Sequence, residues 1–365
     1  MPSDLTTVTR TPFGTTPDGR DVDRYELVHG QVTVAVITYG GVLQSVRVPD
    51  RDGVAADVVL GYDDLAGYVA DTSFHGALVG RFGNRIAGAS FTLDGTEHHL
   101  PQNYGTATLH GGPGGFHAQV WDAQEVDGGV RLSLVSPDGQ EGFPGTVEVE
   151  VTVTLGEAGL RWDYRATTDA PTVLNLTNHA YWNLGGTGAG TVEHHVLRAA
   201  AGRYVPVDEG LLPLPDLAAV DGTPFDFREP TRLGARLRTA DEQLLRAQGY
   251  DHCLLFDTWR DSLAGTREAW SGEPGGLPEV VRAEDPRSGR TLTLRTDQPG
   301  VQLYSGNFLD GTVVGRGGVT FRQGDGFCLE TQHLPDSPNR PDFPSTVLRP
   351  GQEYVTSTTV SFGTV

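Results

Sequence analysis

The sequence predicts an all-β fold, organised as one large antiparallel β-sandwich with a few short helices. The 365 residues include 49 glycines and 23 prolines, residues that mark the tight connections between short strands. Apolar and polar residues alternate in short runs from near the N-terminus to the last residues, which is the pattern of half-buried strands. No composition break marks a linker, so we expect a single domain over residues 1–365.

The clearest strand signal is the run VEVEVTVTL at residues 147–155. Its strict alternation places every valine on one face of an extended strand. A turn candidate follows at 156–159, and LRWDYRA at 160–166 alternates again. The segment therefore predicts a β-hairpin with one packed face. Similar strand-like runs occur at 31–38, 291–295, 301–304 and 354–362.

Helical patterns are few and short. Residues 64–68 and 241–247 each predict a helix of one to two turns. Asp241 stands where its side chain can cap the second helix. Neither is long enough to organise a fold, so the expected architecture remains a β-sandwich whose loops carry the chemistry.

The charge balance excludes several classes of partner. Lys and Arg number 27 against 47 Asp and Glu, a formal net charge of -20, so we expect neither nucleic acid nor an anionic membrane as partner. A phosphorylated sugar would need a basic cluster, and the sequence offers only Arg81 and Arg85 for one. No apolar run of about eighteen residues appears and the N-terminus lacks a signal-peptide pattern, which favours a cytoplasmic protein.

Cysteine and histidine patterns give no metal site. Cys253 and Cys328 are far apart in sequence, and the simplest interpretation is two buried thiols. Two pairs of adjacent histidines occur, at 98–99 and 194–195. Adjacent side chains on a strand point to opposite faces, so such a pair does not chelate one metal easily, and we expect surface or rim histidines.

Polar residues embedded in apolar or glycine-rich surroundings are the candidates for function, because a buried titratable group must be compensated. Each stretch alone also has a structural explanation. Together they supply Asn, Arg, two His, Asp and Glu, a set suited to holding several hydroxyl groups while moving two protons. Tyr181 and Trp182 add flat apolar faces of the sort that cover a pyranose ring. The stretches are 80–86, 109–112, 176–182, 249–252 and 326–331.

At these residues the sequence resembles the aldose 1-epimerase (galactose mutarotase) family. The resemblance runs from about residue 30 to the C-terminus and implies a galactose-mutarotase-like β-supersandwich. It also implies interconversion of the α and β anomers of free hexoses such as galactose and glucose, without a metal or an organic cofactor. The strings that carry it, in the family's order, are GRFGNRIAG, LHGG, NLTNHAYWNL, GYDH, QPGVQLYSGNFLDG and GFCLETQHLPDSPN.

The resemblance also assigns roles to residues. The family's general acid falls on His179 and its general base on Glu330. The sugar-binding positions fall on Asn84, Arg85, His110, Tyr181, Asp251 and Gln302. Gly83 and Ala180 stand where the family more often has Ala and Ser, small-for-small changes that leave the assignment intact.

This chemistry requires one base and one acid. Anomers interconvert when a base takes the proton of the C1 hydroxyl while an acid protonates the ring oxygen, after which rotation about C1–C2 and reclosure complete the exchange. Reference pKa values of about 4.3 for Glu and about 6.5 for His predict an ionised Glu330 and a His179 that can hold a proton near neutral pH.

Two alternatives of a different class remain open. A glycoside hydrolase uses two carboxylates, and Asp251 with Glu330 could supply them. A non-catalytic sugar-binding module could occupy the same fold. The preferred aldose is not determined by the sequence, and we expect a monomer or a homodimer that takes a small-molecule sugar.

Overall fold

The computed structural model describes residues 5–257 and 276–365 and is built from three large antiparallel sheets. The first has nine strands, in the order β11 (Asp122–Val126), β12 (Gly129–Ser136), β13 (Val147–Gly156), β14 (Gly159–Thr168), β30 (Tyr354–Thr364), β24 (Arg290–Thr296), β23 (Glu279–Glu284), β18 (Val196–Ala199) and β21 (Thr231–Arg232). The second has six, in the order β17 (Tyr181–Trp182), β28 (Phe327–Gln332), β25 (Gly300–Tyr304), β22 (Asp251–Phe256), β19 (Ala201–Tyr204) and β20 (Ala218–Ala219). The third joins β1 (Thr7–Thr15), β2 (Asp21–His29), β3 (Val32–Ile37), β4 (Leu43–Pro49) and β5 (Ala55–Asp57).

Smaller elements complete the described part of the chain. Paired short strands are β6 (Leu78–Val79) with β16 (Thr177–Asn178), β7 (Arg85–Ile86) with β10 (Thr108–Leu109), β8 (Ser90–Leu93) with β9 (Thr96–His99), β15 (Thr172–Val173) with β29 (Val347–Leu348), and β26 (Asp310–Val314) with β27 (Thr320–Arg322). The helices are α1 (Leu65–Ala70) and α2 (Glu242–Ala247). Single 3₁₀ turns are η1 (Ala87–Ala89), η2 (Phe116–Ala118), η3 (Gln140–Gly142), η4 (Val192–His194), η5 (Leu233–Ala235), η8 (Arg316–Gly318) and η9 (Ser337–Asn339).

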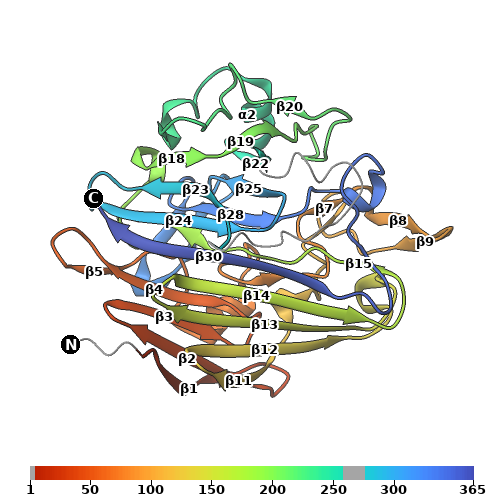
Figure 1. The fold of residues 1–365 in the computed structure, drawn as a ribbon, viewed down its shortest axis with the longest axis horizontal. Helices are drawn as coiled ribbons and strands as arrows, with labels where there is room; N and C mark the ends of the chain where they lie inside the picture. Colours follow the sequence, from red (N-terminus) through yellow and green to blue (C-terminus); the bar gives the residue numbers. More distant parts are fainter. Residues whose placement is uncertain (1–4, 258–275) are drawn as a thin grey trace.

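The predicted hairpin forms as β13 and β14. Burial alternates along β13, with its valines inside and the residues between them exposed or half-buried. The two strands pair antiparallel from Val147 to the closing pair Gly156 and Gly159. Gly159 has a φ of +107°, and a Cβ there would lie 2.3 Å from the Val360 carbonyl oxygen, so the turn requires glycine. Figure 1 shows β12, β13, β14 and β30 crossing the molecule side by side.

Both predicted helices are confirmed. The Asp64 carboxylate accepts a hydrogen bond from the Gly67 amide at the start of α1. At the start of α2 the Asp241 carboxylate accepts from the amides of Gln243 and Leu244. These N-caps satisfy amides that have no partner within a helix.

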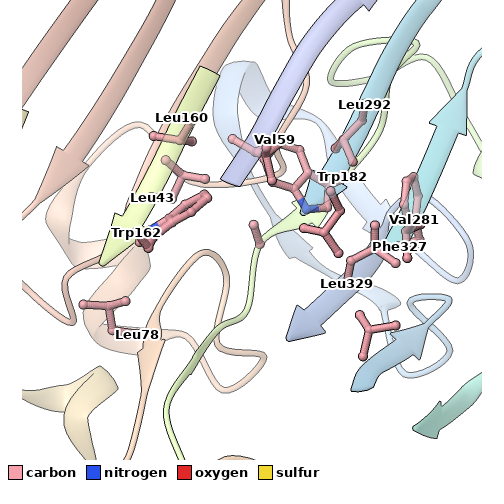
Figure 2. Packing of buried hydrophobic residues seen from close by; sticks show 14 of the residues in the cluster. Leu43, Val59, Leu78, Leu160, Trp162, Trp182, Val281, Leu292, Phe327 and Leu329 are labelled. Carbon is pink, nitrogen blue, oxygen red and sulfur yellow. The ribbon is translucent and has the colours of Figure 1, made fainter. Parts of the chain in front are cut away.

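The largest apolar core is shared by the three sheets (Figure 2). Trp162 of β14 and Trp182 of β17 both belong to this core, and both are buried. Tyr181 and Trp182 are adjacent on a strand and therefore point to opposite faces. The prediction that Trp182 covers a sugar ring is wrong, because its indole packs in the core. Cys253 and Cys328 are buried free thiols, as predicted.

The second sheet carries polar residues on one face and core residues on the other. Strands β22, β25 and β28 are buried at every position. Val301, Phe327 and Leu329 belong to the large core. Because side chains alternate along a strand, Gln302 and Glu330 point to the opposite face. That face is the floor of the site described below.

Two further observations bear on the predictions. His194 ends η4 and His195 follows it, so the pair is not on a strand, and His195 is fully buried. The expectation of two rim histidines is therefore wrong for His195, which accepts a hydrogen bond from the Leu184 amide at Nε2. Within residues 5–257 and 276–365, no helix is long and apolar enough to span a membrane.

Candidate active site

Cross-strand register brings the predicted residues of the second sheet together. Gln302 of β25 lies directly opposite Glu330 of β28. In the neighbouring row Tyr304 lies between Asp251 of β22 and Cys328 of β28. Directly opposed residues have Cβ atoms about 5 Å apart. Residues distant in sequence thus form one compact polar patch.

Asp251 is the electrostatic centre of that patch. Its Oδ2 lies 3.1 Å from Nη2 of Arg85, and its Oδ1 accepts a 2.6 Å hydrogen bond from Nε2 of Gln302. All three side chains are almost fully buried. The carboxylate has lone pairs beyond these two bonds, so it can still accept from a sugar hydroxyl.

Hydrogen bonds of Asn84 and His110 hold the backbone that carries Arg85. Asn84 has a φ of +68°, and its Oδ1 accepts from the amide of Arg85 at 2.9 Å. The Asn84 amide in turn donates to Nδ1 of His110 at 3.2 Å. Because Nδ1 is an acceptor here, the neutral His110 ring carries its proton on Nε2 and presents a donor. The Arg85 guanidinium also lies 4.6 Å from the centre of the Tyr104 ring, a cation–π contact that the sequence did not reveal.

The predicted acid and base face each other. Nε2 of His179 lies 3.6 Å from Oε1 of Glu330, and both side chains are almost completely buried. Oε2 of Glu330 has no hydrogen-bond partner, and neither does Oε1 of Gln302. Unpartnered buried acceptors are rare in folded proteins. These two oxygens are therefore positioned to receive hydroxyl groups of a ligand.

Burial drives both members of the pair toward their neutral forms. It lowers the pKa of His179 to about 4. It raises the pKa of Glu330 well above its usual range, and the Asp251 carboxylate adds to this effect. These directions oppose the expectation, based on reference values, of an ionised Glu330 at neutral pH, because desolvation penalises each charged form.

Tyr181 lies behind His179, 5.1 Å away between ring centroids. Its hydroxyl donates a 3.0 Å hydrogen bond to the backbone carbonyl of Ser73. The ring stacks on His75 at 4.5 Å, and His75 lies 3.0 Å from the Asp71 carboxylate. The predicted sugar-binding residue Tyr181 thus already has a backbone partner for its hydroxyl.

Phe74 forms an aromatic wall that the sequence did not reveal. Its ring centroid lies 4.6 Å from that of His110 and 5.8 Å from that of His179. Its φ is +60°, a conformation uncommon for a bulky residue, which marks a segment held in place by its surroundings. No motif in the sequence distinguishes Phe74, because its role depends on this backbone conformation.

The same side chains also bring together atoms of the kind that hold a metal ion. One ligand atom each from His110, His179 and Glu330 lie within 4.8 Å of one another. A metal-binding imidazole needs a free lone pair on the nitrogen that faces the ion. In His110 the amide of Asn84 occupies the Nδ1 lone pair, which leaves a protonated Nε2. This arrangement suits a hydroxyl acceptor and does not fit a metal ion.

Comparison with known proteins gives a consistent result. The family model described as "Aldose 1-epimerase" matches residues 23–361. The chain is 43% identical to galactose mutarotase of Rattus norvegicus over 359 residues, covering 98% of this chain and 99% of the relative. It is 41% identical to the galactose mutarotase of Homo sapiens, over 98% of this chain and 99% of that one. It is 36% identical to aldose 1-epimerase of Escherichia coli over 351 residues, covering 95% of this chain and 96% of the relative.

Solved structures with the same fold include an aldose epimerase homologue from C. elegans. It superposes with a TM-score of 0.83 at 30% identity, covering 93% of this chain and 98% of that chain. Galactose 1-epimerase from Lactobacillus acidophilus superposes with a TM-score of 0.82 at 27% identity, covering 99% of both chains. The predicted β-sandwich with few helices is thus confirmed.

Proposed function

Because the chain belongs to the aldose 1-epimerase family and is an isomerase of that class, we propose that it acts on free hexoses, galactose and glucose among them. We propose further that His179 and Glu330 move the protons. The observation that carries this assignment is the buried pair of side chains, 3.6 Å apart between Nε2 and Oε1. A single sugar held over this pair can place both its C1 hydroxyl and its ring oxygen within reach.

Ring opening needs one proton removed and one delivered. In the proposed division of roles the Glu330 carboxylate takes the proton from the C1 hydroxyl. The His179 imidazolium gives a proton from Nε2 to the ring oxygen, and the bond between C1 and the ring oxygen breaks. The products are an open-chain aldehyde, a neutral His179 and a protonated Glu330. After rotation about C1–C2 the same two groups reverse their roles to close the ring.

Burial of the pair favours the protonation state that follows ring opening. Burial favours a neutral imidazole and a neutral carboxyl group. Transfer of one proton from Glu330 to His179 creates the ion pair needed to open a cyclic sugar, without exchange with solvent. Both states are used in one reaction cycle, because ring opening starts from the ion pair and ring closure starts from the neutral pair.

The other residues have supporting roles in this proposal. Asp251 is the acceptor for sugar hydroxyls, with Arg85 and Gln302 fixing its orientation. His110 is a donor through Nε2, because the Asn84 amide occupies its Nδ1. Phe74 adds an apolar wall against which the sugar can pack. Tyr181 supports the ring of His179.

The hydrolase alternative lacks a specific observation in its favour. Asp251, its proposed second carboxylate, has one oxygen bonded to Arg85 and the other to Gln302. Both carboxylate oxygens already hold neighbouring side chains, which suits a binding role.

The proposal is tested by following freshly dissolved α-D-galactose and α-D-glucose by polarimetry or proton NMR. The wild-type protein is expected to accelerate the approach to anomeric equilibrium, and His179→Gln is expected to remove most of the acceleration. Failure to accelerate anomerisation of any common aldose would contradict the proposal. Release of sugar from aryl glycosides would favour the hydrolase, and sugar binding without either reaction would favour the binding module.

Three expectations drawn from the sequence stay predictions. They are a single domain over residues 1–365, a cytoplasmic location, and a monomeric or homodimeric state.

A further inference from the structure

The thiol of Cys328 faces the second nitrogen of His179. Its Sγ lies 3.6 Å from Nδ1, while Nε2 of the same ring lies 3.6 Å from Oε1 of Glu330. Both contacts come from one strand, β28, in which Cys328 and Glu330 are two positions apart. Residues at that spacing share a face of the sheet. The single strand β28 thus provides the contact atom for both ring nitrogens of His179.

We propose that Cys328 is a positioning residue for the acid: its sulfur accepts a hydrogen bond from Nδ1–H of His179 and so keeps Nε2 directed at Glu330 and the sugar. The inference rests on the proposed function and deepens it, since nothing above assigns a role to this thiol. In this proposal Cys328 acts on the sugar only through His179.

The reaction requires this placement of the proton. When His179 gives up the proton on Nε2, the proton on Nδ1 must stay, so that Nε2 has a lone pair with which to accept a proton during ring closure. A partner at Nδ1 that accepts a hydrogen bond selects that tautomer. If Nδ1 were instead an acceptor, as it is in His110, Nε2 would keep its proton and could not reverse its role.

A sulfur atom suits this position better than an oxygen anion. Burial raises the pKa of Cys328 well above its usual range, so the group stays a neutral thiol. Neutral sulfur is a weak acceptor. It can orient the imidazole without the stabilisation of the imidazolium that a carboxylate would provide. The lowering of the His179 pKa to about 4 by burial is therefore kept.

Simple packing is the competing explanation. Cys328 belongs to a small apolar cluster that includes Leu60, Tyr181 and Phe321. The chain offers a matched control in Cys253, which is equally buried on β22 of the same sheet. Cys253 packs against Val205 and Leu334. If packing were the whole role, truncation of either thiol would have the same effect.

The first test leaves the protein unaltered. Two-dimensional NMR that correlates ring nitrogens with ring protons reports the tautomer of a neutral histidine. For wild-type protein at neutral pH we expect His179 as the Nδ1–H tautomer, assigned by comparison with His179→Gln. The Nε2–H tautomer would overturn the proposal. This readout does not depend on turnover, so it stays informative if the protein fails to accelerate anomerisation, a failure that would count against the proposed function alone.

The second test compares Cys328→Ala, Cys328→Ser and Cys253→Ala. Loss of the acceptor in Cys328→Ala is expected to lower kcat on the order of tenfold with KM within about threefold, because the acid loses its orientation. Cys328→Ser restores an acceptor that is stronger than sulfur. It is expected to recover most of kcat and to shift upward the limb of the pH profile that reports His179.

Cys253→Ala is expected to match the wild-type kcat. Equal kcat values for Cys328→Ala and the wild-type protein would overturn the proposal, as would equal losses in the two alanine variants. A serine variant no better than the alanine variant would also count against it. If Cys328→Ala does not fold, the serine variant and the tautomer measurement decide the question.

Discussion

Strands β13 and β28 illustrate two ways in which a strand is specified. Along β13 buried valines alternate with more exposed residues, so one face packs in the core and the other meets solvent. All six residues of β28 are buried. The face of β28 that points away from the core lines the pocket. Cys328 and Glu330 lie on that face, whereas the corresponding face of β13 carries more exposed polar residues. The alternating sequence of β13 is therefore enough to identify it as a strand with one packed face. The sequence of β28 reflects instead the polar side chains that the strand places in the pocket.

The difference extends to energetics. Substitutions on β13 act on stability through lost apolar contacts. Buried polar groups of the pocket are costly to desolvate and are kept for chemistry. A replacement that leaves no buried charge without its partner can therefore reduce activity without reducing stability. Four substitutions test this contrast, beginning with the largest expected effect.

Glu330→Gln is expected to lower kcat by a factor on the order of 10² to 10⁴, because the amide cannot take the proton of the C1 hydroxyl. It should also raise the melting temperature at neutral pH. The pKa of Glu330 is raised in the folded protein, so the unfolded chain releases this proton at a lower pH than the folded one. Wild-type stability therefore falls as the pH rises from the unfolded value toward the folded value.

The gain in Glu330→Gln should accordingly vanish below about pH 4 and grow above it. Polarimetry measures the first effect and thermal unfolding across pH the second. A variant that is inactive and also less stable at neutral pH would show that Glu330 supports the fold, which contradicts the contrast drawn between β13 and β28.

Asp251→Asn is expected to raise KM by about ten- to a hundredfold, since hydrogen bonds to a charged group contribute about 1.5–3 kcal/mol. It should also lower the free energy of unfolding by about 3 kcal/mol, because the Arg85 guanidinium stays buried without its counterion. Asp94→Asn is the matched control: Asp94 pairs with Arg349 at the surface, with both side chains about half exposed. For Asp94→Asn, both KM and the free energy of unfolding measured in urea should match the wild-type values. Equal effects in both variants would exclude a special role for the buried pair.

Val153→Ala tests the framework. Val153 of β13 is fully buried in the large core, so its truncation should lower the free energy of unfolding by about 2 kcal/mol. Because β13 does not contribute to the pocket, kcat and KM should stay at wild-type values. Glu148→Ala on the exposed face of the same strand is the control and should change stability by less than about 0.5 kcal/mol. A fall in kcat for Val153→Ala would mean that the first sheet is coupled to the site.

Sequence reasoning succeeded where a local pattern or a family string carried the information. The alternation at 147–155 predicts β13, and the short helical patterns at 64–68 and 241–247, the second with Asp241 as its cap, predict both helices. The family strings that contain His179 and Glu330 identify two residues whose Nε2 and Oε1 atoms lie 3.6 Å apart in the fold. Their proximity follows from cross-strand register over long sequence separations, which no local pattern encodes.

The failures have physical causes of the same kind. Trp182 was assigned to the sugar on residue type alone. Because neighbouring side chains on a strand point to opposite faces, Trp182 points into the core, whereas Tyr181 points toward His179 in the pocket. Phe74 was missed because its part in the site depends on a backbone conformation. Reference pKa values contain no desolvation, which lowers the pKa of His179 and raises that of Glu330 in this buried pair.

Tyr181→Phe has the smallest expected effect and separates the structure from the family resemblance. The resemblance implies that Tyr181 binds sugar, whereas its hydroxyl donates to the Ser73 carbonyl. If that backbone bond is its role, loss of the hydroxyl should cost about 1 kcal/mol of stability and change KM by less than about threefold.

Tyr304→Phe is the matched control for this substitution. Its ring lies 5.9 Å from Tyr181 in the same cluster, and its hydroxyl likewise has a backbone partner, the amide of Phe308 at 2.9 Å. Parallel small effects in both variants would assign Tyr181 to the support of His179. A tenfold rise in KM for Tyr181→Phe alone, with unchanged stability, would mean that the hydroxyl leaves Ser73 when sugar binds and would restore it to the sugar-binding set.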